Sequence, residues 1–173
     1  LWAALPDARV APIDRGACQI MIAGIGGTGV VTVGAILGMA AHLDGLAMAG
    51  FDMTGVSQKN GAVYSHLKIA RTPDHLASAR IGSGDADLLL AFDLIAALAS
   101  ESIQTAAAAR TRAVANVDIV PNFEFQFDRD RTIDHRRLLD SLRARTAGVV
   151  EVDAKRIAET VLGDSIAANM FMV

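Results

Sequence analysis

Apolar residues along this chain fall into two patterns: short runs typical of buried strands, and longer stretches with helical spacing. The short runs predict strands at residues 19–24, 46–52, 62–70, 87–93, 112–121 and 148–154. Helical spacing predicts helices at residues 30–42, 133–145 and about 155–162, with an alanine-rich helix after Asp93, which is placed to cap it. Because strands and helices alternate throughout, we expect an α/β fold, a three-layer α/β/α, Rossmann-like domain with a mostly parallel sheet.

One predicted strand, residues 62–70, differs from its neighbours because polar and apolar residues alternate cleanly along it. Tyr64, His66 and Lys68 share one face, and the apolar side chains share the other face with Ser65. This pattern predicts a strand with one solvent-exposed face. We therefore interpret His66 as a surface or interface residue rather than as a general base.

The segment between Arg15 and His42 contains no charged residue, and an uncharged run of that length raises the question of a membrane span. Against a span, the run has six glycines between residues 24 and 38, has no aromatic belt and lacks a basic flank on one side. A strand, a glycine turn and a buried helix explain the run better. We expect no membrane association.

Composition excludes several further classes of partner and site. The chain has 173 residues, a net charge of −3, 52% hydrophobic and 5% aromatic residues, which fits one tightly packed α/β domain. Its arginines are scattered rather than clustered, so nucleic acid is not an expected partner. Cys18 is the only cysteine, which excludes an internal disulfide and fits a reducing, cytoplasmic setting. The four histidines lack metal-ligand spacing, so no metal site is predicted.

The strongest local motif is the glycine loop Gly24-x-Gly26-x-x-Gly29, between a predicted strand and a predicted helix. This spacing is typical of loops that wrap around a dinucleotide pyrophosphate, with the N–H groups and positive dipole end of the helix facing the phosphates. The acid that would bind a ribose is less well placed. Asp44 has the right separation from the glycines but follows the helix, and Asp52, at the end of the second strand, lies farther along the chain than the usual spacing of about 20 residues. From the residues alone, a dinucleotide site and close packing of the helix on the sheet both stay open.

A second polar loop, residues 53–61, follows the second predicted strand, at the edge where α/β proteins usually bind ligands. This loop is either part of a binding site or a solvated surface segment. The two loops together supply the candidate ligand-binding residues, which are Gly24, Gly26, Gly27, Thr28, Gly29, Ser57, Gln58, Lys59 and Gly61. No residue is assigned a catalytic role.

Four blocks of the sequence, in order, resemble the gamma-type domain of 2-oxoacid:ferredoxin oxidoreductases, above all the fused indolepyruvate ferredoxin oxidoreductases. The blocks are GIGGTGVVTVGAILGMAAHLDG, DMTGVSQKNGAVYSHLKIA, GDADLLLAFDL and LGDSIAANMF. The resemblance covers residues 19–173 and leaves residues 1–18 as an irregular lead-in. The block around Asn169 resembles a family segment that leads into a further helix, so we expect the domain to be truncated at its C-terminus. Asn60 stands where the family more often has a second glycine, which should alter the loop slightly.

The resemblance implies a domain of an enzyme that oxidatively decarboxylates an arylpyruvate, with indolepyruvate the expected substrate, to an aryl-acetyl-CoA. Such enzymes use thiamine diphosphate, and iron–sulfur clusters pass their electrons to ferredoxin. In the family these cofactors lie largely in other domains or subunits. This sequence agrees, because it has no thiamine-type Gly-Asp-Gly motif and one cysteine cannot ligate a cluster. We therefore expect no cofactor and no activity in the chain alone.

The resemblance also implies partners: the other domains or subunits of the oxidoreductase, ferredoxin for the whole enzyme, and, as a further option, a second copy of the chain in a homodimer. The domain is expected to pack on the thiamine domains and to help form the CoA side of the cleft, with CoA the best candidate ligand of the glycine loop. The alternatives are an autonomous Rossmann-type enzyme that binds NAD or ATP, and an interaction module without a ligand.

Overall fold

The computed structural model describes residues 13, 15–54, 61–118 and 134–173, which form a six-stranded sheet flanked by helices. The strands are β1 (Ala17–Ile25), β2 (Ala47–Thr54), β3 (Ala62–Ala70), β4 (Leu88–Ala91), β5 (Arg112–Asn116) and β6 (Gly148–Val152). The helices are α1 (Val30–Leu43), α2 (Leu94–Leu98), α3 (Ser100–Ile103), α4 (His135–Arg145) and α5 (Ala154–Leu162), with 3₁₀ turns η2 (Pro73–His75) and η4 (Ala168–Met172).

The strand order is β2-β3-β1-β4-β5-β6. Strands β1, β4, β5 and β6 pair in parallel, whereas β3 lies antiparallel to both of its neighbours, β2 and β1. Strand β3 is therefore the one reversed strand of the sheet. The prediction of an α/β fold with a mostly parallel sheet is confirmed.

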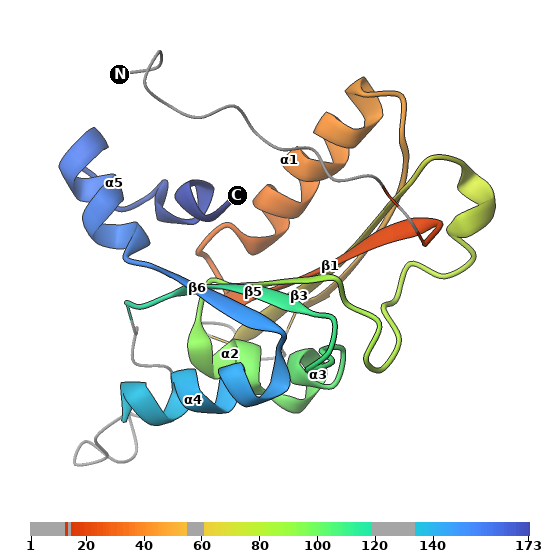
Figure 1. The fold of residues 1–173 in the computed structure, drawn as a ribbon. Coiled ribbons are helices and arrows are strands. Elements are labelled where there is room, and N and C mark those ends of the chain that lie inside the picture. Colours follow the sequence, from red (N-terminus) through yellow and green to blue (C-terminus); the bar gives the residue numbers. More distant parts are fainter. Residues whose placement is uncertain (1–12, 14, 55–60, 119–133) are drawn as a thin grey trace.

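Helices cover both faces of the sheet, which gives three layers (Figure 1). Alternate residues of β1 face opposite layers: Ile20 and Ile22 pack with α1, α5 and η4, whereas Met21 and Ala23 pack with α2 and α4. Side chains on both faces of β1 are buried, as expected for a strand covered by helices on both sides. This arrangement explains why the first predicted strand is a continuous apolar run.

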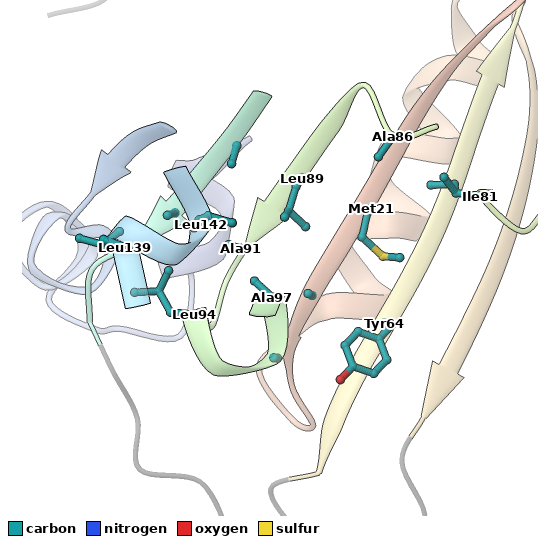
Figure 2. Close-up of a cluster of buried hydrophobic side chains, with 14 residues drawn as sticks. Met21, Tyr64, Ile81, Ala86, Leu89, Ala91, Leu94, Ala97, Leu139 and Leu142 are labelled. Carbon is teal, nitrogen blue, oxygen red and sulfur yellow. The ribbon is translucent and has the colours of Figure 1, made fainter. Parts of the chain in front are cut away.

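The core on the α2 and α4 face brings together side chains from β1, β3, β4, β5, α2 and α4 (Figure 2). Leu89 of β4 lies among Leu94 of α2, Leu142 of α4 and Met21 of β1, and each of these four side chains is fully buried. Burial of a side chain of this size contributes roughly 1.5–3 kcal/mol. Alanines fill the remaining positions of the cluster, so the helices approach the sheet closely.

Three predicted strands end earlier than their apolar runs because a polar side chain diverts the backbone. Asp93 leaves β4 to cap α2, and Asp153 leaves β6 to cap α5 by accepting from the Arg156 N–H at 3.1 Å. The Asn116 side chain accepts from the Asp118 N–H at 3.3 Å, a local turn that ends β5. The alanine-rich helix after Asp93 is divided into α2 and α3 by Ala99, whose backbone is extended.

The prediction of a solvent-exposed face on β3 is wrong. Tyr64 is 7% exposed and His66 1% exposed, because β3 lies inside the sheet and the segment after it folds over this face. The Ile81 N–H donates to His66 Nδ1 at 3.1 Å, and Ile81 belongs to the same buried cluster as Tyr64. Burial, with the nearby charges of Arg80 and Lys68, lowers the pKa of His66. His66 is thus a neutral core residue.

Helix α1 lies close on the sheet because glycines face it. A Cβ on Gly34 would lie 2.9 Å from Ser65 Oγ, and a Cβ on Gly38 would overlap with Met48 Cε. At the helix start, a Cβ on Gly24 would lie 2.7 Å from Val30 Cγ2 and 3.2 Å from Phe92 Cβ.

None of the helices in the described part of the chain is long and apolar enough to cross a membrane.

We expect Gly24→Ala to lower the free energy of unfolding by about 1–3 kcal/mol, because the added methyl group meets the stiff, branched side chain of Val30. Urea unfolding of both proteins measures the difference. The matched control is Gly148→Ala on β6, where an added Cβ has nothing within 4 Å. Equal stabilities of the two variants would contradict this explanation.

Candidate functional site

A pocket of about 300 Å³ opens at the carboxyl ends of β1, β4 and β5. Its lining residues come from the glycine loop, the ends of the three strands, the start of α5 and the segment before and within η4. They are Ile25, Gly27, Thr28, Phe92, Asp93, Asn116, Asp118, Lys155, Ser165, Ile166, Ala168 and Asn169. Ligands of open α/β sheets usually bind at this edge, outside the carboxyl ends of the strands.

The glycine loop forms one wall of the pocket and depends on two left-handed glycines. Gly27 has φ 88° and Gly29 has φ 85°, a backbone conformation that favours glycine. Between them, Thr28 folds back on the strand: its Oγ1 donates to the Ile25 carbonyl at 2.6 Å and its N–H to the same carbonyl at 3.2 Å. Gly29 is the N-cap of α1, whose first three N–H groups lack intrahelical acceptors, as at every helix start.

The second glycine of the loop contacts protein backbone. The Gly26 N–H donates to the Gly61 carbonyl at 2.8 Å, and a Cβ on Gly26 would lie 3.4 Å from that oxygen. In the usual dinucleotide site, this glycine allows the pyrophosphate to approach. Here the carbonyl of Gly61, just before β3, occupies the position beside Gly26 that the pyrophosphate would take.

The insertion of β3 also moves the ribose-binding acid of a dinucleotide site away from the loop. In the usual order the second strand lies beside the first, and its acid faces the ribose. Here β3 separates β2 from β1, so Asp52 on β2 lies two strand spacings, about 9–10 Å, from β1. Asp44 caps the C-terminus of α1, at the far end of that helix from the glycine loop. Neither acid lines the pocket.

Asp93 is the most deeply buried acid at the pocket. Its Oδ1 accepts from the Ala96 N–H at 2.8 Å, which confirms the predicted helix cap. The residue is 4% exposed, and within the described ranges Oδ2 has no hydrogen-bond partner. Burial raises the pKa of this carboxyl, opposed by the backbone N–H groups of Ala96 and Ile95. A buried acceptor without a partner beside a pocket favours a ligand that donates a hydrogen bond.

The opposite wall carries the polar groups that follow β5. Asn116 Oδ1 accepts from the Ala154 N–H at 3.4 Å and so joins the end of β5 to the start of α5. Lys155 Nζ lies 3.8 Å from Asp118 Oδ2, and both side chains are partly exposed. Such a long, exposed ion pair is weak, so the Lys155 ammonium stays able to bind an anion.

Comparisons with known proteins identify the fold and the family. The family model described as pyruvate ferredoxin/flavodoxin oxidoreductase matches residues 19–173. The chain belongs to this family. Curated relatives include indolepyruvate oxidoreductase subunit IorB of Methanothermobacter thermautotrophicus, 23% identical over 155 residues that cover 90% of this chain and 75% of the relative. The IorB subunit of Archaeoglobus fulgidus is 28% identical over 158 residues, 90% of this chain and 73% of the relative.

Solved structures with the same fold include pyruvate oxidoreductase subunit PORC of Thermotoga maritima. It has a TM-score of 0.61 and 18% identity, covering 91% of this chain and 73% of that one. A 2-oxoglutarate:ferredoxin oxidoreductase of Magnetococcus marinus, with 2-oxoglutarate, coenzyme A and succinyl-CoA bound, has a TM-score of 0.59 and 16% identity. The match covers 91% of this chain and 23% of that one.

Only some of the residues predicted to bind a ligand lie at the pocket. Gly27 and Thr28 line it, and Gly29 follows them at the start of α1. Gly24 lies inside β1, and Gly26 and Gly61 hold each other by their backbones. Ser57, Gln58 and Lys59 lie outside the described residues.

Sequence reasoning missed the wall formed by Asn116, Asp118 and Lys155. The signal that could have found it was the position of these polar residues, at and just after the end of one parallel strand and at the start of the helix that follows another. Among the described residues no group of three or more His, Cys, Asp or Glu side chains is arranged to hold a metal ion.

Replacing Asp93 should change the pH dependence of stability. Because the folded pKa of Asp93 is raised, the wild type loses stability as pH rises from the unfolded pKa, about 4, through the raised folded value. An asparagine at this position would be an equally good cap without a charge. We expect the stability of Asp93→Asn relative to wild type to increase between about pH 3 and pH 7, measured by urea unfolding. A relative stability that stays constant or falls over this range would contradict the assignment.

Proposed function

We propose that the chain is a gamma-type domain of an oxidoreductase that converts an arylpyruvate, with indolepyruvate the first candidate, to its aryl-acetyl-CoA and passes the electrons to ferredoxin. In this proposal the chain supplies binding surface for CoA and for the domains that carry the thiamine diphosphate. Membership of the family supports the reaction class, and the names of the curated relatives support indolepyruvate. The observation that carries the proposed role in CoA binding is the polar pocket beside the glycine loop.

The residues of this chain do not fit an iron–sulfur cluster. Such clusters need several cysteine thiolates, and the sequence has one cysteine. Cys18 is partly buried on β1, where burial and the neighbouring Asp87 raise the pKa of its thiol. We infer that the clusters belong to other parts of the enzyme, and that this chain contributes by binding and positioning.

The pocket suits one part of a CoA molecule. Its volume of about 300 Å³ is at the lower end of small-molecule sites, so most of a long cofactor would lie outside it. The positive end of α1, the backbone of Gly27 and Thr28 and the ammonium of Lys155 favour phosphate at the rim. The carboxylates of Asp93 and Asp118 favour hydroxyl or amino groups inside.

A second surface supports packing against other domains. Helix α1 has no Asp, Glu, Lys or Arg, and its outer side exposes large apolar side chains. On the α1, α5 and η4 side of the sheet, the exposed large apolar residues are Val31, Ile36, Met39, Leu43, Met48, Val150, Val161, Leu162, Ile166, Met170, Phe171 and Val173. The outer side of α4, by contrast, carries arginines and Asp140. Concentrated apolar surface of this kind marks a protein interface. We propose that the thiamine-carrying domains cover it.

Calorimetric titration of the chain with CoA, NAD and ATP tests the ligand. We expect CoA to bind, and Lys155→Gln to weaken the binding about twofold to fivefold, because the ammonium is partly exposed. The control is Arg136→Gln on α4, which removes the same charge from the opposite layer. Tight binding of NAD or ATP instead of CoA would overturn the proposal in favour of an autonomous nucleotide enzyme.

Expression of the chain with the other subunits of the oxidoreductase tests the surface. Met39 on α1 is 59% exposed, so Met39→Lys should leave stability within about 0.5 kcal/mol and reduce co-purification with the thiamine-carrying subunit. Ala144→Lys adds the same charge at an exposed position of α4, in the opposite layer, and is the matched control. Equal co-purification of both variants would contradict the proposal, and loss of self-association by Met39→Lys alone would favour a homodimer.

A further inference from the structure

A hydrogen bond across 141 residues joins the C-terminal segment to the glycine loop. Asn169 Nδ2, on η4, donates to the Thr28 carbonyl at 2.5 Å. Asn169 is 9% exposed, and both residues line the pocket. The family assignment and the glycine spacing give this asparagine no role.

The glycine loop needs an anchor at this carbonyl. Thr28 lies between two glycines with positive φ, and peptide groups beside glycine reorient at low energetic cost. The bonds from Thr28 to the Ile25 carbonyl fix its N–H and its hydroxyl, but not its own carbonyl. Because a peptide group is planar, whatever holds the Thr28 carbonyl also sets the direction of the Gly29 N–H, immediately before α1.

The carbonyl is also an electrostatic feature of the site. It lies at the pocket, near the positive end of α1, where an unpaired carbonyl oxygen would repel an anionic ligand. The amide of Asn169 binds that oxygen and carries no charge itself. A donor that is neutral and buried therefore holds the loop without adding a competing charge.

We propose that Asn169 is a positioning residue for the ligand-binding loop: it holds the Thr28–Gly29 peptide in one orientation and makes the Ser165–Asn169 segment part of the site. The role in CoA binding rests on the proposed function. The role in loop conformation does not, because it follows from the hydrogen bond alone.

Hydrogen exchange of the chain without ligand tests the conformational role. In Asn169→Leu, which has a similar volume and no donor, we expect the loop amides of Thr28 and Val33, which donate to the Ile25 and Gly29 carbonyls, to exchange about tenfold faster, the equivalent of losing one neutral hydrogen bond. Amides of β4 should be unchanged, as should the loop amides of Met170→Gln, an exposed control on the same turn. Unchanged loop exchange in Asn169→Leu would overturn the proposal.

A second variant gives a readout that a purely structural role would not move. In Asn169→Asp the ionised side chain cannot donate to the carbonyl, whereas the protonated acid can. Burial raises the pKa of such a carboxyl, so the loop amides should exchange about tenfold faster than wild type at about pH 7.5 and nearly equally at about pH 5. The other titratable groups of the pocket, Asp93, Asp118 and Lys155, are shared with wild type measured at the same pH. A ratio that does not change with pH would overturn the proposal.

CoA titration of the same variants separates the two roles. If wild type binds CoA, Asn169→Leu should raise its dissociation constant about tenfold, and Asn169→Asp should do so at about pH 7.5 but not at about pH 5. Wild-type affinity in both variants would overturn the role in binding. If wild type does not bind CoA, the proposed function fails, and hydrogen exchange still decides whether Asn169 holds the loop.

Discussion

The antiparallel strand β3, inserted between β1 and β2, is the constraint on which the rest of this site depends. The carbonyl of the residue just before β3 binds the Gly26 N–H, and so one donor of the glycine loop is used inside the protein. The same insertion moves β2, and the acid it carries, away from the loop. A glycine spacing typical of a dinucleotide site in the usual strand order therefore lacks, in this order, the free donor and the neighbouring acid of such a site.

What the loop keeps is its backbone geometry. Gly27 and Gly29 still turn the chain into α1, and α1 still begins beside the carboxyl ends of the parallel strands. Polar side chains line the other side of the pocket, where Asn116 ends β5 and where Asp93 and Lys155 follow β4 and β6. A loop that presents backbone N–H groups, facing a wall of side chains, suits a ligand with both an anionic part and a hydrogen-bonding part.

The layers and most element positions could be predicted from the sequence because both depend on local patterns. A buried strand such as β1 is continuously apolar, and α1 has apolar residues at helical spacing with glycines toward the sheet. The prediction of an exposed face on β3 was wrong. The alternation along the strand shows only which residues are polar, whereas the burial of His66 depends on the segment around Ile81, 15 residues away, which folds over it. The ends of β4, β5 and β6 were placed late because single Asp and Asn side chains divert the chain there.

The site was harder to predict than the fold because its parts meet only through the strand order. Asn169 and Thr28 are 141 residues apart, and no local pattern relates a turn near the C-terminus to a loop near the N-terminus. Once β4 and β5 are placed beside β1, however, their polar ends must face the glycine loop, and α5 must return the chain over it. The strand order thus decides which residues form the pocket. Within it, the hydrogen bonds of Thr28 and Asn169 join the glycine loop to the end of β1 and to η4.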